Sequence, residues 1–487
     1  MKKVKTRKFL WALLPMMAAA LMTTACSSDD DSTSVTPNPA ADQTVKSIPY
    51  TVTVGQGTTT RATVANDDVT LQFADGDKLY VEDNSGNVYG CLTLQSGAGA
   101  PTGATFSGDL YYTGSAPAAG LMLTATLVGA NDKLATTDGD KVTGFKAYNA
   151  EDNICATMAD AVAKFSKLQG SNTYGAKSFA LSQQTAFLKF KVILEDGTTP
   201  GNDAVAVTVK DGNTTLGTGT TVASGTAQFT DTYAGFVLPV ADNTTISDDA
   251  KIWVGSVDTP ADESIDLGGS NTLAAGKVYE VAEKTKDFVR LWAGGPVWAT
   301  KNLGASSVTG YGNYYAWGET TGYAQSESHD FGWANYTLCN GSETTLTKYN
   351  NDSSYGTDPD NKTEFADYNY VDDAAYAASS GTWRMPTGTE FDNLLSNTTN
   401  AWTTVNSVAR TFTGKDSYAG KAILLPAAGG LNGAKPVGQG TIGNYWSSSL
   451  YTSNPSQGRN LIFTSDNAYT DVNYRNFGRS VRPVRTN

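Results

Sequence analysis

Short runs in which apolar and polar residues alternate recur from about residue 48 to residue 281, separated by turns rich in Gly and Asn. The run Val205 to Val209 has valine at every second position, and Tyr50 to Val54 alternates in the same way. Because successive side chains of a strand point to opposite faces, this alternation predicts strands with one buried face. With one helical candidate, Ala156 to Leu168, the pattern favours two antiparallel β-sandwiches at about residues 46–165 and 166–283.

The composition changes after residue 284. Seven of the nine tryptophans and fifteen of the 24 tyrosines lie at or beyond Trp292. This concentration of large aromatic side chains predicts a separate domain with its own core, residues 284–487. The stretch from Asn350 to Tyr370 has no periodicity, so we expect many loops, with a short helix at Phe391 to Leu395.

The N-terminus has the order of a secretory signal, with basic residues up to Lys8 followed by an apolar run from Phe9 to Met22. That run is shorter than the ~20 residues needed to span a bilayer. It ends at Cys26 in a sequence that resembles a bacterial lipobox, in which the cysteine is acylated. The prediction is a signal peptide at residues 1–25 and a lipid anchor on Cys26 in the outer membrane. An ordinary signal peptide with an incidental cysteine is the alternative.

Residues 26–45 contain mostly Ser, Thr, Asp, Pro and Ala, which predicts a flexible tether. The acidic run Asp29 to Asp31 resembles the surface-export signal of lipoproteins in some Gram-negative bacteria. We therefore expect a protein that is displayed at the cell surface.

The balance of charge excludes one broad class of function. The chain has 35 Lys and Arg against 48 Asp and Glu, a formal charge of −13. A nucleic-acid binder needs a positive field, so nucleic acid is not expected as a partner. The single histidine, His329, excludes zinc sites built from several histidines. Cys91 and Cys155 could form a disulfide or be two small buried side chains.

Three short stretches before residue 284 resemble the fimbrillin superfamily of bacterial pilins and pilin-like lipoproteins. They are Thr60-Arg61-Ala62, Phe73 to Val81, and Gln183 to Leu188. The resemblance implies two transthyretin-like β-sandwiches. In such pilins a protease cuts after an arginine and removes the first strand, and a donor strand from a neighbouring subunit fills the groove. It thus implies processing between Arg61 and Ala62 and pilin subunits as partners through strand addition. An ordinary loop tripeptide is the alternative.

The last two-fifths of the chain resembles the major paralogous domain called FISUMP, found on surface lipoproteins of gut and rumen bacteria. Four sets of residues carry the resemblance: 297–305, 311–319, 383–387, and 445–449 with 478–484. The resemblance implies a loop-rich α+β fold of the C-type-lectin type, related in architecture to the formylglycine-generating enzymes. The whole chain is then expected to be mostly β, two sandwiches followed by this domain.

Enzymatic activity is not expected. The formylglycine-generating enzymes use a pair of cysteines that hold copper, whereas this domain has only Cys339. Cys339 and His329 could form a thiolate–imidazole pair, but no orienting third group accompanies them. No pair of acidic residues stands out for glycoside hydrolysis.

An acid-rich stretch, Asn350 to Asp373, contains seven Asp and Glu residues. Such loops suit calcium, but the spacing is not that of the twelve-residue calcium loop. We expect no cofactor, with calcium as the alternative to a solvated loop. Asp372 or Asp373 is a candidate helix N-cap.

The segment between Trp446 and Gly478 is rich in Tyr, Asn, Ser and Asp, which is the composition of a recognition surface. In some C-type-lectin-like proteins of phage and bacteria, the equivalent stretch is the ligand face. The candidate ligand-binding residues are Tyr451, Asn454, Arg459, Asn467, Tyr469, Asp471 and Asn473.

These features together predict a cell-surface lipoprotein, a fimbrial tip or fimbrillin-like adhesin that binds an extracellular glycan or protein through its C-terminal domain. We expect a tip position because only Thr486 and Asn487 follow the last strand of that domain, and two residues span at most ~7 Å. The alternatives are an extracellular glycan-active enzyme and a purely structural surface or pilus subunit.

Overall fold

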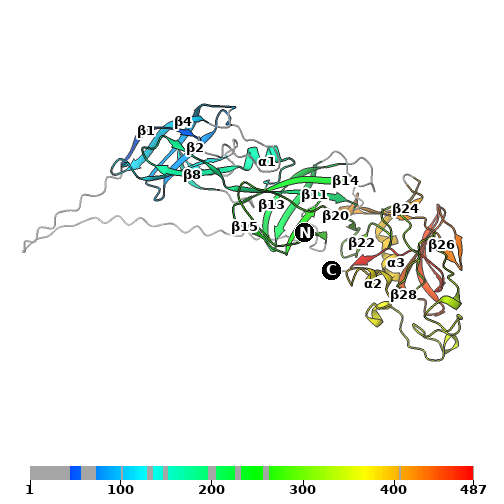
Figure 1. The fold of residues 1–487 in the computed structure, drawn as a ribbon. Helices are drawn as coiled ribbons and strands as arrows, with labels where there is room; N and C mark the ends of the chain where they lie inside the picture. Colours follow the sequence, from blue (N-terminus) through cyan, green and yellow to red (C-terminus); the bar gives the residue numbers. More distant parts are fainter. Residues whose placement is uncertain are drawn as a thin grey trace, which may run out of the picture. The chain divides into compact units, whose positions relative to one another are not determined.

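The structure is a computed structural model that describes residues 44–55, 73–99, 103–128, 135–145, 152–195, 204–224, 232–255, 263–404 and 407–485. It is mostly β and contains several sheets, which confirms the expected fold class (Figure 1). The signal peptide, the tether, Cys26, Arg61 and Ala62 lie outside the described residues. Within the described part of the chain, no helix has both the length and the apolar character needed to cross a membrane.

The first sheet has the strand order β10-β8-β5-β2-β3-β4-β1-β9. Its first and last strands, β10 and β9, are separated by only two residues of chain, so the two edges of the sheet lie close together. The strands are β1 (Val45–Val54), β2 (Lys78–Asp83), β3 (Val88–Ser96), β4 (Ala104–Thr113), β5 (Met122–Val128), β8 (Lys167–Thr173), β9 (Ser178–Phe179) and β10 (Ser182–Gln183). A separate hairpin consists of β6 (Ala135–Asp138) and β7 (Lys141–Phe145).

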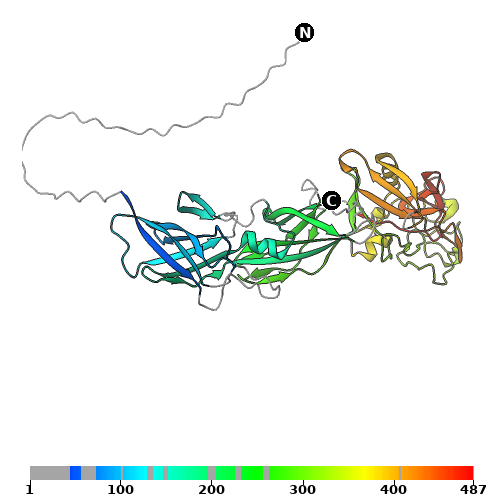
Figure 2. The same ribbon diagram turned by 90° about the horizontal axis from the view of Figure 1, so that it is seen from above.

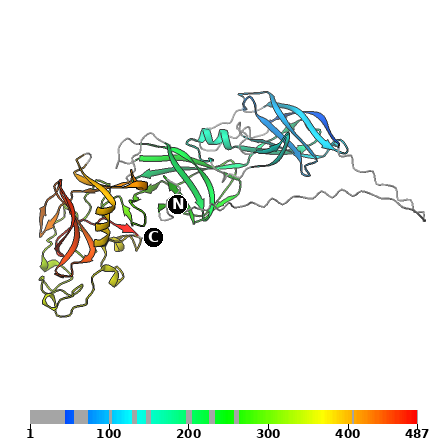
Figure 3. The same ribbon diagram turned by 180° about the vertical axis from the view of Figure 1, so that it is seen from behind.

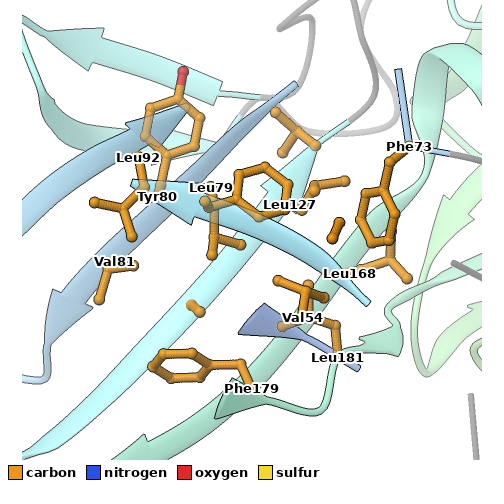
Figure 4. Close-up of a cluster of buried hydrophobic side chains, with 14 of the residues drawn as sticks. Val54, Phe73, Leu79, Tyr80, Val81, Leu92, Leu127, Leu168, Phe179 and Leu181 are labelled. Carbon is orange, nitrogen blue, oxygen red and sulfur yellow. The ribbon is translucent and has the colours of Figure 1, made fainter. Parts of the chain in front are cut away.

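Side chains from most of these strands fill the core that the first sheet encloses. Figure 4 shows Val54 of β1 beside Phe179 and Leu181, with Leu79 and Leu127 from neighbouring strands. The predicted alternation of β1 is confirmed, because Tyr50, Val52 and Val54 are buried. β1 pairs with β4 over ten residue pairs and with β9 over two.

The predicted helix is present as α1 (Met158–Phe165), whose N-cap Thr157 accepts a hydrogen bond from the Asp160 N–H. The strands that follow it, β8, β9 and β10, still belong to the first sheet. The first sheet therefore continues past the expected boundary at residue 165 and ends at Gln183. Cys91 and Cys155 are thiols, and no disulfide joins the cysteines of the described residues.

The second sheet has the order β17-β16-β12-β13-β14-β11-β19, and β20 also pairs with β11. Its strands are green in Figure 2. Val207 and Val209 are buried, as the alternation predicts, and the Phe190 and Phe236 rings stack at 4.4 Å. The strands are β11 (Thr185–Leu194), β12 (Ala204–Asp211), β13 (Thr214–Ser224), β14 (Thr232–Ala241), β16 (Ala250–Val254), β17 (Ile265–Asp266), β19 (Val278–Glu280) and β20 (Lys284–Lys286), with a hairpin of β15 (Thr244–Ile246) and β18 (Asn271–Leu273).

Residues 288–485 contain short strands and helices among long loops (Figure 3). The strands are β21 (Phe288–Arg290), β22 (Val297–Ala299), β23 (Thr398–Thr403), β24 (Ala409–Gly414), β25 (Ala422–Pro426), β26 (Gly430–Asn432), β27 (Lys435–Val437), β28 (Gly443–Leu450), β29 (Gln457–Phe463), β30 (Ala468–Tyr474) and β31 (Val484–Arg485). The 3-10 helices are η2 (Trp333–Asn335), η3 (Ser353–Tyr355), η4 (Phe365–Tyr368) and η5 (Asp416–Tyr418). Trp298, Trp317 and Trp446 are fully buried, so the aromatic residues of this region do form cores of their own. The division of the chain into separately folding domains stays a prediction.

Two α-helices in this region begin at caps that the sequence carries. α2 (Ala374–Ala378) has the predicted N-cap Asp373, whose carboxylate accepts the N–H groups of Ala375 and Tyr376 at 2.9 and 3.0 Å. α3 (Gly388–Asn397) is the expected short helix, and a capping box between Thr387 and Glu390 fixes its start.

Candidate functional site

One face of the sheet β28-β29-β30 is covered by α3 (Figure 1). Leu461 and Phe463 of β29 pack there with Phe391 and Leu394 of the helix. The Asp392 carboxylate accepts a hydrogen bond from the Thr470 hydroxyl at 2.7 Å and pairs with the Arg459 guanidinium at 3.0 Å. α3 thus holds the sheet from one side, and Arg459 is directed toward the helix.

The opposite face of β30 brings together three of the predicted ligand-binding residues. The register pairs Tyr469 with Ile462, Asp471 with Asn460, and Asn473 with Gly458. Because side chains alternate along a strand, Tyr469, Asp471 and Asn473 share one face, which we call the β30 face. Tyr469 is 49% exposed, and the other two side chains are partly exposed.

The remaining predicted residues lie in turns at the two ends of the sheet. Tyr451 and Asn454 are in the turn between β28 and β29, where the Asn454 side-chain oxygen accepts the Ser456 N–H and hydroxyl at 3.0 and 2.7 Å. Asn467 is in the turn between β29 and β30 and is exposed. Asn454 therefore shapes its turn, and the structure does not place these turn residues on the β30 face.

An aromatic cluster lies at the end of β30 next to Asn473. The Tyr474 ring, 38% exposed, is 6.2 Å from the Trp333 ring and 5.8 Å from the Phe477 ring. The Asn476 amide donates to the Phe331 carbonyl at 2.7 Å, which ties the Trp333 loop to the chain after β30. Sequence reasoning missed Trp333, because its contact with Tyr474 joins residues about 140 positions apart.

Three arginines follow β30 within eight residues, Arg475, Arg479 and Arg482, and each is at least nine-tenths buried. No acidic side chain pairs with any of them in the described residues. Burial lowers the pKa of Arg479 and that of Arg482 to about 10, so both guanidinium groups stay charged at neutral pH.

Two of these arginines have their donors well satisfied. Arg475 donates to the Tyr336 hydroxyl at 2.8 Å and to the carbonyls of residues 348, 349 and 455 at 3.1–3.2 Å. Arg482 donates to the Asn302 side-chain oxygen and to the carbonyls of residues 299 and 424, all at 2.7–3.0 Å. Both side chains act as structural links between loops.

Arg479 is different. Its Nη1 donates to the Gly478 and Leu431 carbonyls at 3.2 and 3.4 Å, and its Nη2 lies 3.4 Å from the Asn473 side-chain oxygen. Its Nε has no hydrogen-bond partner in the described residues. A buried and under-used guanidinium therefore lies beside the β30 face. Sequence reasoning did not single out Arg479, because its lack of an acidic partner depends on the fold.

The residues considered for catalysis make separate contacts. The Cys339 thiol is buried and donates to the Trp333 and Tyr336 carbonyls at 3.4 and 3.5 Å. Burial raises the pKa of Cys339, which favours the unreactive thiol form. The His329 ring stacks on the Tyr323 ring at 3.6 Å. This arrangement supports neither a nucleophile nor its base.

The acid-rich stretch is internally hydrogen-bonded. Burial acts to raise the pKa of Asp360, but hydrogen bonds from the Lys362, Asn350 and Tyr349 N–H groups hold it below its usual value. The other six acids of the stretch also accept hydrogen bonds from neighbouring groups. Among the described residues, no three His, Cys, Asp or Glu side chains are grouped to hold a metal ion.

Comparison with known proteins gave matches only among solved structures. No protein-family model and no curated protein matches the chain. A candidate cell adhesion protein from Bacteroides ovatus is 13% identical, with a TM-score of 0.26, covering 49% of this chain and 92% of its own. One from Bacteroides fragilis is also 13% identical, with a TM-score of 0.22 and coverages of 50% and 91%. A candidate adhesin from Bacteroides thetaiotaomicron is 13% identical, with a TM-score of 0.20 and coverages of 46% and 88%.

These similar structures are thus candidate adhesion proteins of Bacteroides. At such identities and TM-scores, the likeness establishes no activity for this chain. The FISUMP resemblance of residues 284–487 is not confirmed by these comparisons and stays a prediction.

Proposed function

We propose that this protein is a cell-surface lipoprotein and adhesin, which binds an extracellular glycan or protein through residues 288–485. The observation that carries the proposal is the β30 face, where Tyr469, Asp471 and Asn473 project together from one strand. Tyrosine supplies rigid contact area, while Asn and Asp supply hydrogen bonds, which is the usual chemistry of a recognition surface.

The fixed position of β30 supports a binding role. α3 holds the other face of the sheet, and Asp392 of that helix bonds both Thr470 and Arg459. A surface that is already ordered loses little conformational entropy when a ligand binds. The β30 face is therefore pre-organised for binding.

The proposal also includes a lipid anchor on Cys26 and an acceptor role toward pilin subunits. A cut after Arg61 would separate β1 from the rest of the first sheet. β1 contributes the buried side chains Tyr50, Val52 and Val54 and pairs with both β4 and β9. Its loss would leave an apolar groove flanked by two strand edges, which an extended segment of another subunit could fill.

The test is an array of glycans and extracellular-matrix proteins, probed with purified residues 27–487. A triple variant with Tyr469→Ala, Asp471→Ala and Asn473→Ala should lose binding at least tenfold while its melting temperature changes little, because exposed substitutions usually move stability by about 0.5 kcal/mol or less. A control variant with Lys435→Ala and Val437→Ala, which changes two exposed residues of the β26–β27 hairpin, should bind normally. Unchanged binding by the triple variant would place the site elsewhere, and conversion of an arrayed glycan into products would favour the enzyme alternative.

A further inference from the structure

Arg479 has poorer hydrogen bonding than Arg475 and Arg482, although its guanidinium also lies 5.0 Å from the Phe477 ring. Removing a charged group from water is costly unless hydrogen bonds or an opposite charge replace the lost hydration. Arg475 and Arg482 each make four hydrogen bonds of 3.2 Å or less. Arg479 makes three of 3.2–3.4 Å, and its Nε makes none within the described residues.

The unused donors of Arg479 lie on one edge of the guanidinium. Nη1 is turned inward, to the Gly478 and Leu431 carbonyls, and a Cβ at Gly430 would lie 2.1 Å from it. The other edge consists of Nε, without a partner in the described residues, and Nη2, with one long bond to Asn473. Two N–H groups on one edge of a guanidinium match the two oxygens of a carboxylate.

We propose that the ligand of the β30 face carries a carboxylate, which binds the Nε–Nη2 edge of Arg479 after displacing the Asn473 side chain. This rests on the proposed function and specifies the ligand class of the same site. Arg479 supplies charge and geometry, while the exposed side chains of the β30 face contact the rest of the ligand.

The surroundings favour an acidic sugar over other carboxylates. Asp471 lies two residues from Asn473 on the same face, about 7 Å along the strand, so a densely anionic ligand would be repelled. Asp471 is instead an acceptor for hydroxyl groups. The Phe477 ring lies 5.0 Å from the Arg479 guanidinium, so an apolar surface that suits the C–H groups of a sugar adjoins the charge. A monosaccharide with one carboxylate and several hydroxyls, either a uronic or a sialic acid, satisfies all three features.

Four saccharides, each with one carboxylate or none, test the inference with purified residues 27–487: galacturonic acid and galactose, and sialyllactose and lactose. One acidic member should bind roughly 10- to 100-fold more tightly than its neutral counterpart, the range for a hydrogen-bonded charge pair. The pair that shows the difference tells whether the carboxylate belongs to a uronic acid or to a sialic acid. Arg479→Gln should abolish the preference, whereas Lys435→Gln, which removes an exposed charge from the nearby β26–β27 hairpin, should keep it.

Asn473→Asp is a second variant that does not depend on losing Arg479. It places a carboxylate of the protein itself beside Arg479 Nη2, which should raise the melting temperature. The acidic sugar and its neutral counterpart should then bind with about equal affinity. Equal binding of acidic and neutral sugars by the native chain would overturn the inference and leave the proposed function standing. Preferential binding of a glutamate-rich peptide would overturn the assignment to a sugar, and no binding of any saccharide or arrayed protein would overturn both proposals.

Discussion

Arg475 and Arg479 lie four residues apart in the same buried segment, yet replacing each by methionine is expected to affect stability differently. The carbonyls of residues 348, 349 and 455 accept hydrogen bonds from Arg475, and no other bond to them is found in the described structure. Each buried acceptor left without a partner costs about 1–3 kcal/mol. Arg475→Met should therefore lower the free energy of unfolding by about 3 kcal/mol or more.

The two carbonyls bonded by Arg479 do not depend on it. The Leu431 carbonyl already accepts the Gly478 N–H, and the Gly478 carbonyl accepts the Leu431 N–H, at 3.0 and 2.9 Å. Replacing Arg479 also removes a buried charge that lacks an acidic partner among the described residues. Arg479→Met should thus change the free energy of unfolding by less than about 1 kcal/mol, because a buried charge can often be replaced by an apolar side chain at little loss.

Urea unfolding of purified residues 27–487, followed by tryptophan fluorescence, measures the difference. Seven of the nine tryptophans lie at or beyond Trp292, so the signal reports mainly on the region that contains both arginines. The comparison uses the midpoint and slope of the transition for the native chain and both variants. If Arg479→Met destabilises the protein as much as Arg475→Met, Arg479 is a structural side chain and the reasoning about its unused donors is wrong.

Three further predictions concern other parts of the chain. Cys26→Ala should abolish recovery of the protein in the outer-membrane fraction, and its continued presence there would contradict lipidation. Cys339 should react with a thiol reagent only after unfolding, because burial and its raised pKa keep it a protonated thiol; rapid modification of the native chain would contradict this. Burial raises the pKa of Asp373 to about 6, above its value of 3.8 in the unfolded chain, so its contribution to stability is fully present below pH ~4 and is lost as the pH rises through ~6. Between pH 4 and pH 7, the free energy of unfolding of the native chain should therefore fall on the order of 1–3 kcal/mol relative to that of Asp373→Asn, as measured by urea unfolding. If the two free energies change in parallel with pH, the raised pKa is wrong.

Local patterns predicted the secondary structure well, since they depend on residues close in sequence. The alternation at Val207 and Val209 predicted a strand with a buried face, and it is present. A helix cap was expected at Asp372 or Asp373, before two alanines, and Asp373 is the cap. The first sheet extends past residue 165, because β8 joins it through its pairing with β5, some 45 residues earlier in the chain. That pairing has no local signature.

The candidate site was predictable only in part for the same reason. Composition identified the segment, and alternation along β30 explains why Tyr469, Asp471 and Asn473 lie together. Arg459 faces α3 and pairs there with Asp392, a contact across 67 residues that no local pattern predicts. The isolation of Arg479 from acidic partners appears only when the fold is complete.

The structure of the protein in complex with a saccharide selected on the array tests the central claim most directly. The account predicts that the sugar contacts Tyr469 and Asp471 and lies near Phe477, with its carboxylate on the Nε–Nη2 edge of Arg479. A sugar bound elsewhere on residues 288–485, with the β30 face unoccupied, would contradict it.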